Sequence, residues 1–349
     1  MIWIHGGAYY AGSAWEYPVK GGVRNLVSRG VVVVVIQYRL GLLVFVDGYF
    51  LPKNPNEIWK NRPNISILIG TNKDESMLDY LELYLSGEIN ETYFTRDIVE
   101  ELFDLPLTSS TSNTTQTLYF NIVKDMYEQP YGIKDDDHLG WLKIWNDFST
   151  GFHVGSVGKD VDYWLWLGNP NVYVYELTRS SRIGFNRFYN IPGWQPVPHG
   201  LELYYIWMDW QIDGEWQYAI DHHLINQTDF DLLNFFGETW TNFAKTGIPH
   251  SDWKPTTQET YSYFEIDATR QMKDYYRQRD RIFFNKILPN FINSNDTQPL
   301  PKPTSLSTRT SLSTPTSLTT TPQTGGQNKV TVNSMILLVV VLAHLKFMF

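Results

Sequence analysis

The chain has 349 residues and a formal net charge of −9, which argues against a nucleic-acid partner bound through its phosphates. It contains no cysteine, so a thiolate nucleophile, a zinc–thiolate site and a disulfide are excluded. The length allows one large domain or two ordinary ones. We predict no cofactor and no metal site.

Four segments have the composition of β-strands. The first, residues 1–4, is expected to be short and buried. The second contains the unbroken β-branched run Val31–Val35, which is typical of a central strand buried on both faces. Residues 64–70 and 171–177 supply two more strands. Continuous buried strands of this kind belong to parallel or mixed sheets, so the predicted fold class is α/β.

Two helices are predicted in the second half of the chain. One face of the first carries apolar residues at spacings of three and four, namely Leu233, Phe236, Trp240 and Phe243. Gly247 is expected to end that helix, and Pro249 follows. Residues 274–288 mix apolar and charged side chains, which predicts an amphipathic surface helix.

The composition changes abruptly near residue 298. Residues 304–321 hold three Ser/Thr-rich hexads, which cannot bury a core. In an extracellular protein such a tract is typical of an O-glycosylated stalk, and a plain disordered linker is the alternative. We therefore predict a stalk over residues 298–324.

The last segment, residues 325–349, has the layout of a glycolipid-anchor signal. Gly325 and Gly326 precede a polar spacer of eight residues and the terminal apolar run Met335–Phe349. The alternative is a spanning helix, which needs about 20 apolar residues. Because the run has fifteen residues and includes a histidine and a lysine, we favour the lipid anchor.

Five Asn-x-Ser/Thr sequons are compatible with glycosylation in the secretory pathway. They begin at Asn64, Asn90, Asn113, Asn226 and Asn295. With the anchor signal they predict an extracellular, membrane-anchored protein. No signal peptide opens the sequence, so we expect that an N-terminal part of the protein is missing.

The loop after the first strand carries the first chemical signal. His5-Gly6-Gly7-Ala8 matches the glycine-rich loop that forms the oxyanion hole of α/β-hydrolase esterases. An oxyanion hole needs backbone N–H groups directed at one oxygen, and glycine allows the close approach. Taken alone, the motif also fits an ordinary tight turn.

Together with later motifs, this loop resembles the type-B carboxylesterase/cholinesterase family over roughly residues 1–290. The motifs occur in the family's order at residues 3–8, 31–41, 46–52, 69–76, 192–202 and 240–249. The resemblance implies an α/β-hydrolase fold, whose central, mostly parallel sheet has helices on both faces. It also implies hydrolysis of a carboxylic ester through an acyl-enzyme.

Position within these motifs implies roles for five residues. Gly7 and Ala8 would supply oxyanion N–H groups, and Gly6 would shape the turn. Glu75 would be the acid of a Ser-Glu-His triad, and His199 the general base that deprotonates the serine and protonates the leaving group. Outside the family, Glu75 would be an ordinary loop carboxylate and His199 a surface histidine.

The expected nucleophile is absent from the sequence. No serine has the Gly-x-Ser-x-Gly pattern of a nucleophile elbow, and Ser156 comes nearest but has Val154 in place of the first glycine. In the family the elbow lies between the blocks ending at Gly41 and beginning at Val46. Here only Leu42–Phe45 separate them, whereas a parallel crossover needs about a dozen residues or more. We infer an internal deletion of the nucleophile strand, which leaves an incomplete α/β-hydrolase domain in two parts, 1–45 and 46–297.

The predicted function is that of an ester hydrolase of this family, inactive as written because it lacks the serine. The alternative is a non-catalytic, cholinesterase-like cell-surface interaction protein. A gene-model error, a splice form and a pseudogene stay open as causes, and a general carboxylesterase is favoured over a cholinesterase. The expected partners of the intact parent are a small-molecule ester and, through the anchor, a membrane. A homodimer is left open.

Overall fold

The computed structural model describes residues 1–7, 11–38, 40, 49, 53, 55–104 and 113–292. Ala8, Asn295, the junction Leu42–Phe45, the stalk and the anchor segment lie outside these ranges. Among the described residues, no helix is both long and apolar enough to cross a bilayer. The division at residues 45 and 46 stays a prediction.

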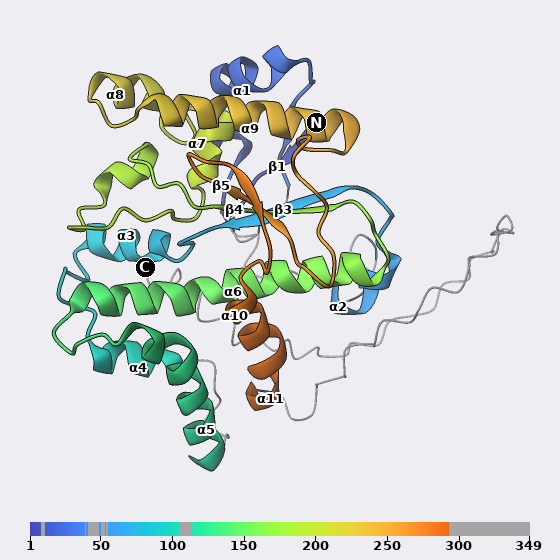
Figure 1. Ribbon diagram of the computed structural model, residues 1–349. Coiled ribbons are helices and arrows are strands. Elements are labelled where there is room, and N and C mark those ends of the chain that lie inside the picture. The colour runs from blue at the N-terminus through green and yellow to red at the C-terminus, as the bar shows by residue number, and fades with distance from the viewer. Residues whose placement is uncertain are drawn as a thin grey trace, which may run out of the picture.

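The described strands form two sheets (Figure 1). A two-stranded parallel sheet pairs β1 (Ile2–Ile4) with β2 (Val34–Ile36). A four-stranded sheet has the order β3-β4-β5-β6, in which the first three strands are parallel and the last is antiparallel. Its strands are β3 (Ile67–Asn72), β4 (Val172–Leu177), β5 (Tyr263–Ile266) and β6 (Gln271–Lys273).

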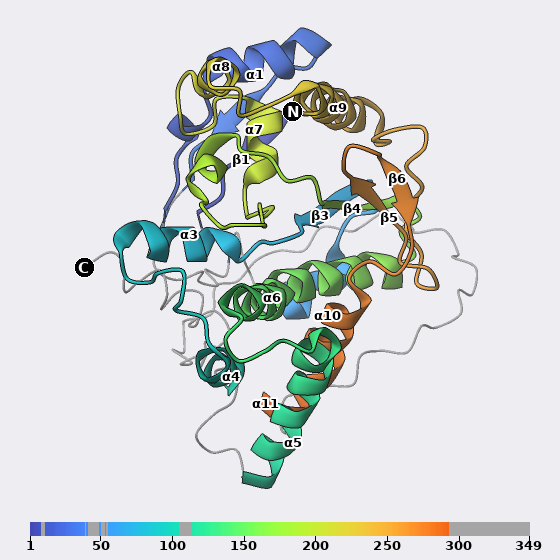
Figure 2. The same ribbon diagram turned by 60° about the vertical axis from the view of Figure 1, so that its left-hand side comes forward.

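Helices cover both faces of the four-stranded sheet. The helices are α1 (Val19–Asn25), α2 (Pro55–Ile58), α3 (Met77–Ser86), α4 (Arg96–Asp104), α5 (Asn113–Val123), α6 (His138–Trp166), α7 (Leu201–Trp207), α8 (Glu215–Asp221), α9 (Gln227–Thr246), α10 (Gln278–Ile282) and α11 (Pro289–Ile292). Figure 2 shows the sheet between α6 on one side and α7 and α9 on the other. In β4, Val172 and Val174 pack in a cluster with α6, whereas Tyr173 and Leu177 pack with α7 and α9. This alternation is what the two-residue period of a strand requires.

The predicted helix before Gly247 is confirmed. It is α9, and the Asn226 side chain accepts a hydrogen bond from the Thr228 N–H at 2.9 Å at its start. Gly247 ends it with φ 73°, a left-handed conformation that glycine adopts without strain. The four predicted apolar residues all pack in the core cluster beneath it.

The predicted surface helix over residues 274–288 is wrong in extent and exposure. Tyr275 and Arg277 have φ values of 63° and 40°, so regular helix begins only at Gln278. It continues through a π-helical turn over Phe283–Ile287, where Phe283 is fully buried. The charged residues of this segment led to the prediction of an exposed helix, but several of them are buried and form ion pairs.

The first two strands are less buried than predicted. Both form, but Ile2, Ile4, Val32 and Val34 keep between 49% and 77% of their surface exposed. The alternate residues Trp3, Val33 and Val35 pack against the core. The prediction that Val31–Val35 is buried on both faces is therefore wrong, because among the described elements none covers the second face.

Candidate active site

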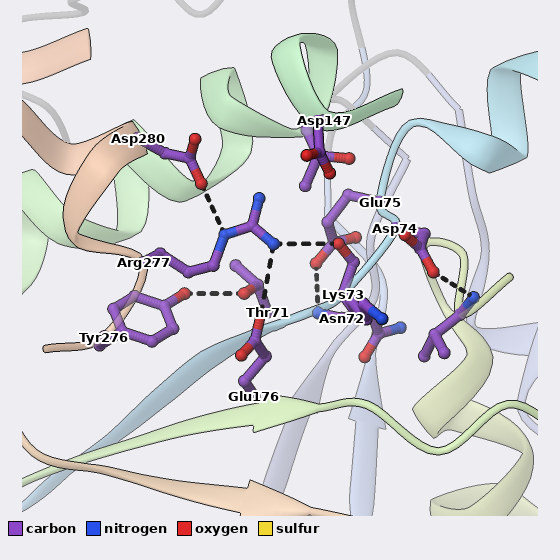
Figure 3. Close-up of polar contacts among 12 residues, drawn as sticks. Thr71, Asn72, Lys73, Asp74, Glu75, Asp147, Glu176, Tyr276, Arg277 and Asp280 are labelled. Carbon is purple, nitrogen blue, oxygen red and sulfur yellow. Dashed lines mark hydrogen bonds and ion pairs between the residues drawn. The ribbon is translucent and has the colours of Figure 1, made fainter. Parts of the chain in front are cut away.

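The structure brings Glu75 and His199 together, although 124 residues separate them. Glu75 lies in the turn after β3, and its buried Oε1 accepts a hydrogen bond from the Asn72 N–H at 2.7 Å (Figure 3). Its Oε2 lies 2.7 Å from Nδ1 of His199. The His199 backbone N–H also donates to the Glu75 carbonyl at 3.2 Å. This geometry holds the imidazole in one orientation.

Asp74 fixes the two loops that carry this pair. Its backbone N–H donates to the Val197 carbonyl at 2.9 Å, and its Oδ2 accepts from the Val197 N–H at 2.9 Å (Figure 3). Its Oδ1 accepts from Asn146 on α6 at 2.9 Å. Burial raises the pKa of Asp74. Sequence reasoning missed this residue, although its position beside Glu75 offered a signal.

A second carboxylate lies next to the pair. Asn72 donates from its side chain to the Pro198 carbonyl at 2.7 Å and to Oε2 of Glu202 at 2.5 Å. Burial, and then the negative charge of Glu75, raise the pKa of Glu202. Asn72 therefore donates a hydrogen bond to each of the two carboxylates and also supports the histidine loop.

The ionisation of the pair favours an imidazolium. Partial desolvation opposes protonation of His199, but the Glu75 carboxylate outweighs it and raises the pKa of His199 to about 9. Burial opposes ionisation of Glu75, yet the charge of His199 keeps the pKa of that carboxyl below its usual range. The His199 side chain is 58% exposed, so solvent screens the interaction.

Buried charges support the acid loop from its other side (Figure 3). Arg277 donates to the Lys73 carbonyl at 3.2 Å and to Glu176 at 3.3 Å, and its Nε donates to Asp280 at 2.7 Å. The hydroxyls of Tyr276 and Thr71 lie 2.7 Å apart. The run of charges after Arg277 resembles a solvated surface, which is why sequence reasoning missed its role.

A mainly apolar pocket of about 250 Å³ opens beside the histidine. His199 and Pro198 line it together with Leu78, Leu81, Phe185, Tyr189, Tyr204 and Trp210. His153, on α6, lies close by, with its ring centre 5.9 Å from that of His199. Among the described residues, no group of three His, Asp or Glu side chains is arranged to hold a metal ion.

The glycine loop after β1 is tightly folded. Gly7 has φ 119°, and a Cβ there would lie 2.1 Å from the Ala11 carbonyl oxygen, so only glycine fits. The Ala11 N–H donates to the Gly7 carbonyl at 2.9 Å, and Nδ1 of His5 lies 2.8 Å from the Gly6 carbonyl oxygen. Within the part of the chain that the structure describes, no hydrogen bond links Gly6 or Gly7 to Glu75 or His199.

The remaining candidate positions have ordinary surroundings. Ser156 lies on α6 and donates to the Phe152 carbonyl at 3.1 Å, so it forms no elbow. The described sequon asparagines are exposed, namely Asn64, Asn90, Asn113 and Asn226.

Comparison with known proteins identifies relatives. The model of the carboxylesterase family matches residues 1–47 and 44–284. The chain is 24% identical to carboxylesterase 1C of Mus musculus over 280 residues, which are 76% of this chain and 45% of that protein. It is 22% identical to bile salt-activated lipase of Bos taurus over 238 residues, 65% of this chain and 36% of that protein. A shorter stretch of 45 residues, 13% of this chain, is 42% identical to 8% of gut esterase 1 of Caenorhabditis elegans. The chain thus spans less than half the length of these relatives.

Proposed function

Because the chain belongs to the carboxylesterase family, we propose that it derives from a serine ester hydrolase and keeps the acid–base half of the triad. Membership of the family implies the α/β-hydrolase fold, with which the sheets and covering helices agree. The contact of 2.7 Å between Glu75 and Nδ1 of His199 carries the proposal. In the neutral ring, this contact would favour the tautomer whose Nε2 can accept the proton of a serine hydroxyl.

In the intact parent, His199 would take the proton of the serine as its oxygen attacks the ester carbonyl, and would return it to the leaving alcohol. The N–H groups of Gly7 and Ala8 would bind the oxyanion, with Gly6 shaping the turn. The apolar pocket beside His199 suits the hydrocarbon part of a small ester. A general base must be neutral when it takes the proton, and the Glu75 carboxylate raises the pKa of His199 to about 9 in this chain.

An internal deletion accounts for the missing serine. The family match is divided at residues 44–47, where the two matched segments overlap. Among the described strands, β1 pairs only with β2, and β3 only with β4. We place the missing nucleophile strand between these two sheets. The division into 1–45 and 46–297 belongs to the same proposal.

The chain as written is then expected to be inactive. Incubation with a fluorophosphonate, followed by mass spectrometry, should find no stoichiometrically labelled serine, and p-nitrophenyl butyrate should be hydrolysed no faster than with denatured protein. One stoichiometrically labelled serine in the unaltered chain would contradict both the deletion and the inactivity.

Restoring a Gly-x-Ser-x-Gly segment between Val44 and Val46 tests the retained half of the triad. The restored chain should hydrolyse the ester, and His199→Ala in it should lower kcat by a factor of about 10³ or more. His222→Ala is the matched control, since His222 is exposed and far from Glu75 in sequence. A restored enzyme that keeps its kcat after His199→Ala would refute the assignment of the base.

The alternative function is a non-catalytic interaction protein at the cell surface, in which the sheet would be intact and only the serine replaced. A genomic segment between the codons for Val44 and Val46 that is intact but lacks the elbow serine would support it. A segment that encodes the elbow would support the esterase.

Extracellular location, glycosylation at the sequons, the stalk and the glycolipid anchor complete the proposal. Release of the expressed protein by a phosphatidylinositol-specific phospholipase would support the anchor. Retention together with a detectable tag at Phe349 would contradict it.

A further inference from the structure

We propose that the outer face of α1 docks on a membrane surface that contains anionic lipid. This docking face consists of an apolar stripe, Trp15, Val19, Val23 and Val27, and a basic border, Lys20 and Arg24. The proposal goes beyond ester hydrolysis and does not depend on it, since neither Glu75 nor His199 takes part. It is also independent of the extracellular location proposed above, because anionic lipid is concentrated in the cytoplasmic leaflet of cell membranes.

The apolar side chains of the docking face are exposed. Val19 and Val23 lie one helical turn apart on α1, Trp15 lies on the short turn before the helix and Val27 on the turn after it. Trp15 is 94% and Val19 79% exposed, and Val23 and Val27 are also exposed. Single exposed apolar residues are common, but exposed valines one helical turn apart, with an exposed tryptophan next to the helix, are typical of helices that lie in a membrane interface.

The inner face of α1 fixes this orientation. A Cβ on Gly21 would lie 2.0 Å from the Trp207 carbonyl oxygen, so the helix backbone packs directly on α7. The Asn25 side chain donates to the Tyr205 carbonyl at 2.7 Å and to that of Ile206 at 3.1 Å. Because these contacts hold the opposite side, the valine row cannot turn inward without breaking them.

The charges beside the stripe are basic, in a chain whose net charge is −9. Residues 14–30 contain Lys20, Arg24 and Arg29 against a single acid, Glu16. Within the described chain, Lys20 and Arg24 form no ion pair, and Arg29 is held by the amides of Asn25 and Asn234 rather than by a carboxylate. Unpaired cations next to apolar side chains fit anionic headgroups above hydrocarbon, whereas a nucleic acid would leave the valines uncovered.

The basic border also lines a pocket of about 400 Å³ between α1, α8 and α9. Three cations, Lys20, Arg24 and Arg29, line it against one carboxylate, Asp209, and its apolar lining includes Trp216, Phe230 and Leu233. Figures 1 and 2 both show α1 at the outer edge of the molecule, next to α8 and α9. A lining that combines an excess of cations with apolar side chains is complementary to an anionic amphiphile, which supports lipid as the occupant.

The absence of cysteine allows a reporter at one position. Val19→Cys in the full chain, labelled with an environment-sensitive nitrobenzoxadiazole dye, would be mixed with vesicles of phosphatidylcholine, alone or with about 30% phosphatidylserine. We expect a blue shift and brighter emission with the anionic vesicles only. Leu118 on α5 is also apolar and is 55% exposed. Leu118→Cys should show neither change, which separates docking of α1 from attachment by another part of the chain. Val23→Cys is a second reporter should Val19→Cys fold poorly.

A second test removes the basic side chains of the docking face. Lys20→Gln with Arg24→Gln should lower the vesicle affinity reported at position 19 about 30-fold, because each basic side chain near an anionic surface contributes about fivefold. Lys134→Gln with Lys254→Gln removes two exposed, unpaired cations elsewhere and should change it little. The proposal is overturned if the dye emission shifts at neither position 19 nor position 23 when anionic vesicles are added. It is also overturned if the shift equals that at position 118, or if it persists after the two charges are removed. A shift that depends on protein concentration without vesicles would assign the face to a second copy instead.

Discussion

The two sheets of this molecule contain similarly apolar strands but have different surroundings. β4 is buried on both faces, because α6 covers one and α7 and α9 cover the other. β1 and β2 pack on the core with one face and leave isoleucine and valine exposed on the other. An apolar strand therefore shows which faces can be buried, while the neighbouring elements decide which ones are.

The residues of the candidate active site are likewise distributed over both sheets, one covered on both faces and the other on one face only. The acid and the base lie on loops next to the covered sheet, where Asp74, Asn72 and Arg277 fix them. The glycine loop belongs to the sheet with the bare face, and in the described chain no hydrogen bond joins it to the pair. The two site residues that contact each other, Glu75 and His199, are therefore those on the loops that buried polar residues support.

The largest expected effect is on the loops of the covered sheet. Asp74→Ala should lower the free energy of unfolding by about 3 kcal/mol, because it leaves the Val197 N–H and the Asn146 amide buried without an acceptor. Asp252→Ala, at a side chain that is 80% exposed, is the control and should change it little. Urea denaturation followed by circular dichroism measures both, and equal effects would mean that Asp74 does not support the loops.

A matched pair of valines compares the sheets directly. Val174→Ala should cost about 2 kcal/mol, since it removes buried methyl groups and leaves a cavity. Val32→Ala makes the same chemical change on the bare face and should cost less than about 0.5 kcal/mol. Similar losses in urea denaturation would show that the second face of β2 is covered in solution.

Periodicity predicted the four strands and α9 because these depend on local sequence and on one buried stripe. It could not predict that β2 is covered on one side only, since burial depends on elements elsewhere in the chain. The extent of α10 was missed because a backbone turn at Arg277 and its buried ion pairs override the apparent helical pattern.

Motif position alone led to Glu75 and His199, and the structure places them in contact. Asp74, Asn72 and Glu202 lie within the same motifs, but their supporting roles were not predicted, because a supporting residue is recognised by what it contacts. Gly6 and Gly7 have the tight turn that the motif predicts, while their catalytic role stays a proposal.

The Glu75–His199 pair gives a smaller, pH-dependent effect. In Glu75→Gln the pKa of His199 should fall from about 9 toward its ordinary value of 6.5, because the carboxylate no longer stabilises the imidazolium. Titration of the His199 ring protons by NMR, assigned with His199→Asn, measures the change. Glu202→Gln is a comparison that should lower the pKa less, since the Glu202 charge acts on His199 without a hydrogen bond.

The sign of the stability change follows from the same raised pKa. The folded protein binds the His199 proton more tightly than the unfolded chain, so this contribution is complete below pH 6.5 and is lost as the pH rises through about 9. Glu75 acts in the opposite sense, and its contribution is lost as the pH falls below its usual range near 4.5. Solvent at the exposed ring keeps both effects small. Glu75→Gln should therefore change how the free energy of unfolding depends on pH between 6.5 and 9. The same pH dependence in both proteins would contradict an interaction between Glu75 and His199.

The smallest expected effect on stability lies on the bare face of β1 and β2. Ile4→Thr with Val32→Thr should leave the Tm within about 2 °C, because both side chains are already exposed and threonine keeps the β-branched shape that a strand favours. The same change should slow aggregation at the Tm several-fold, since apolar strands exposed on one face associate with other chains. Val172→Thr is the control on the covered sheet, where a buried hydroxyl should lower the Tm without improving solubility. Calorimetry gives the Tm and light scattering the aggregation rate. An unchanged aggregation rate after both substitutions would mean that this face does not bind other chains. The two sheets would then differ in the burial of their strands but not in their tendency to aggregate.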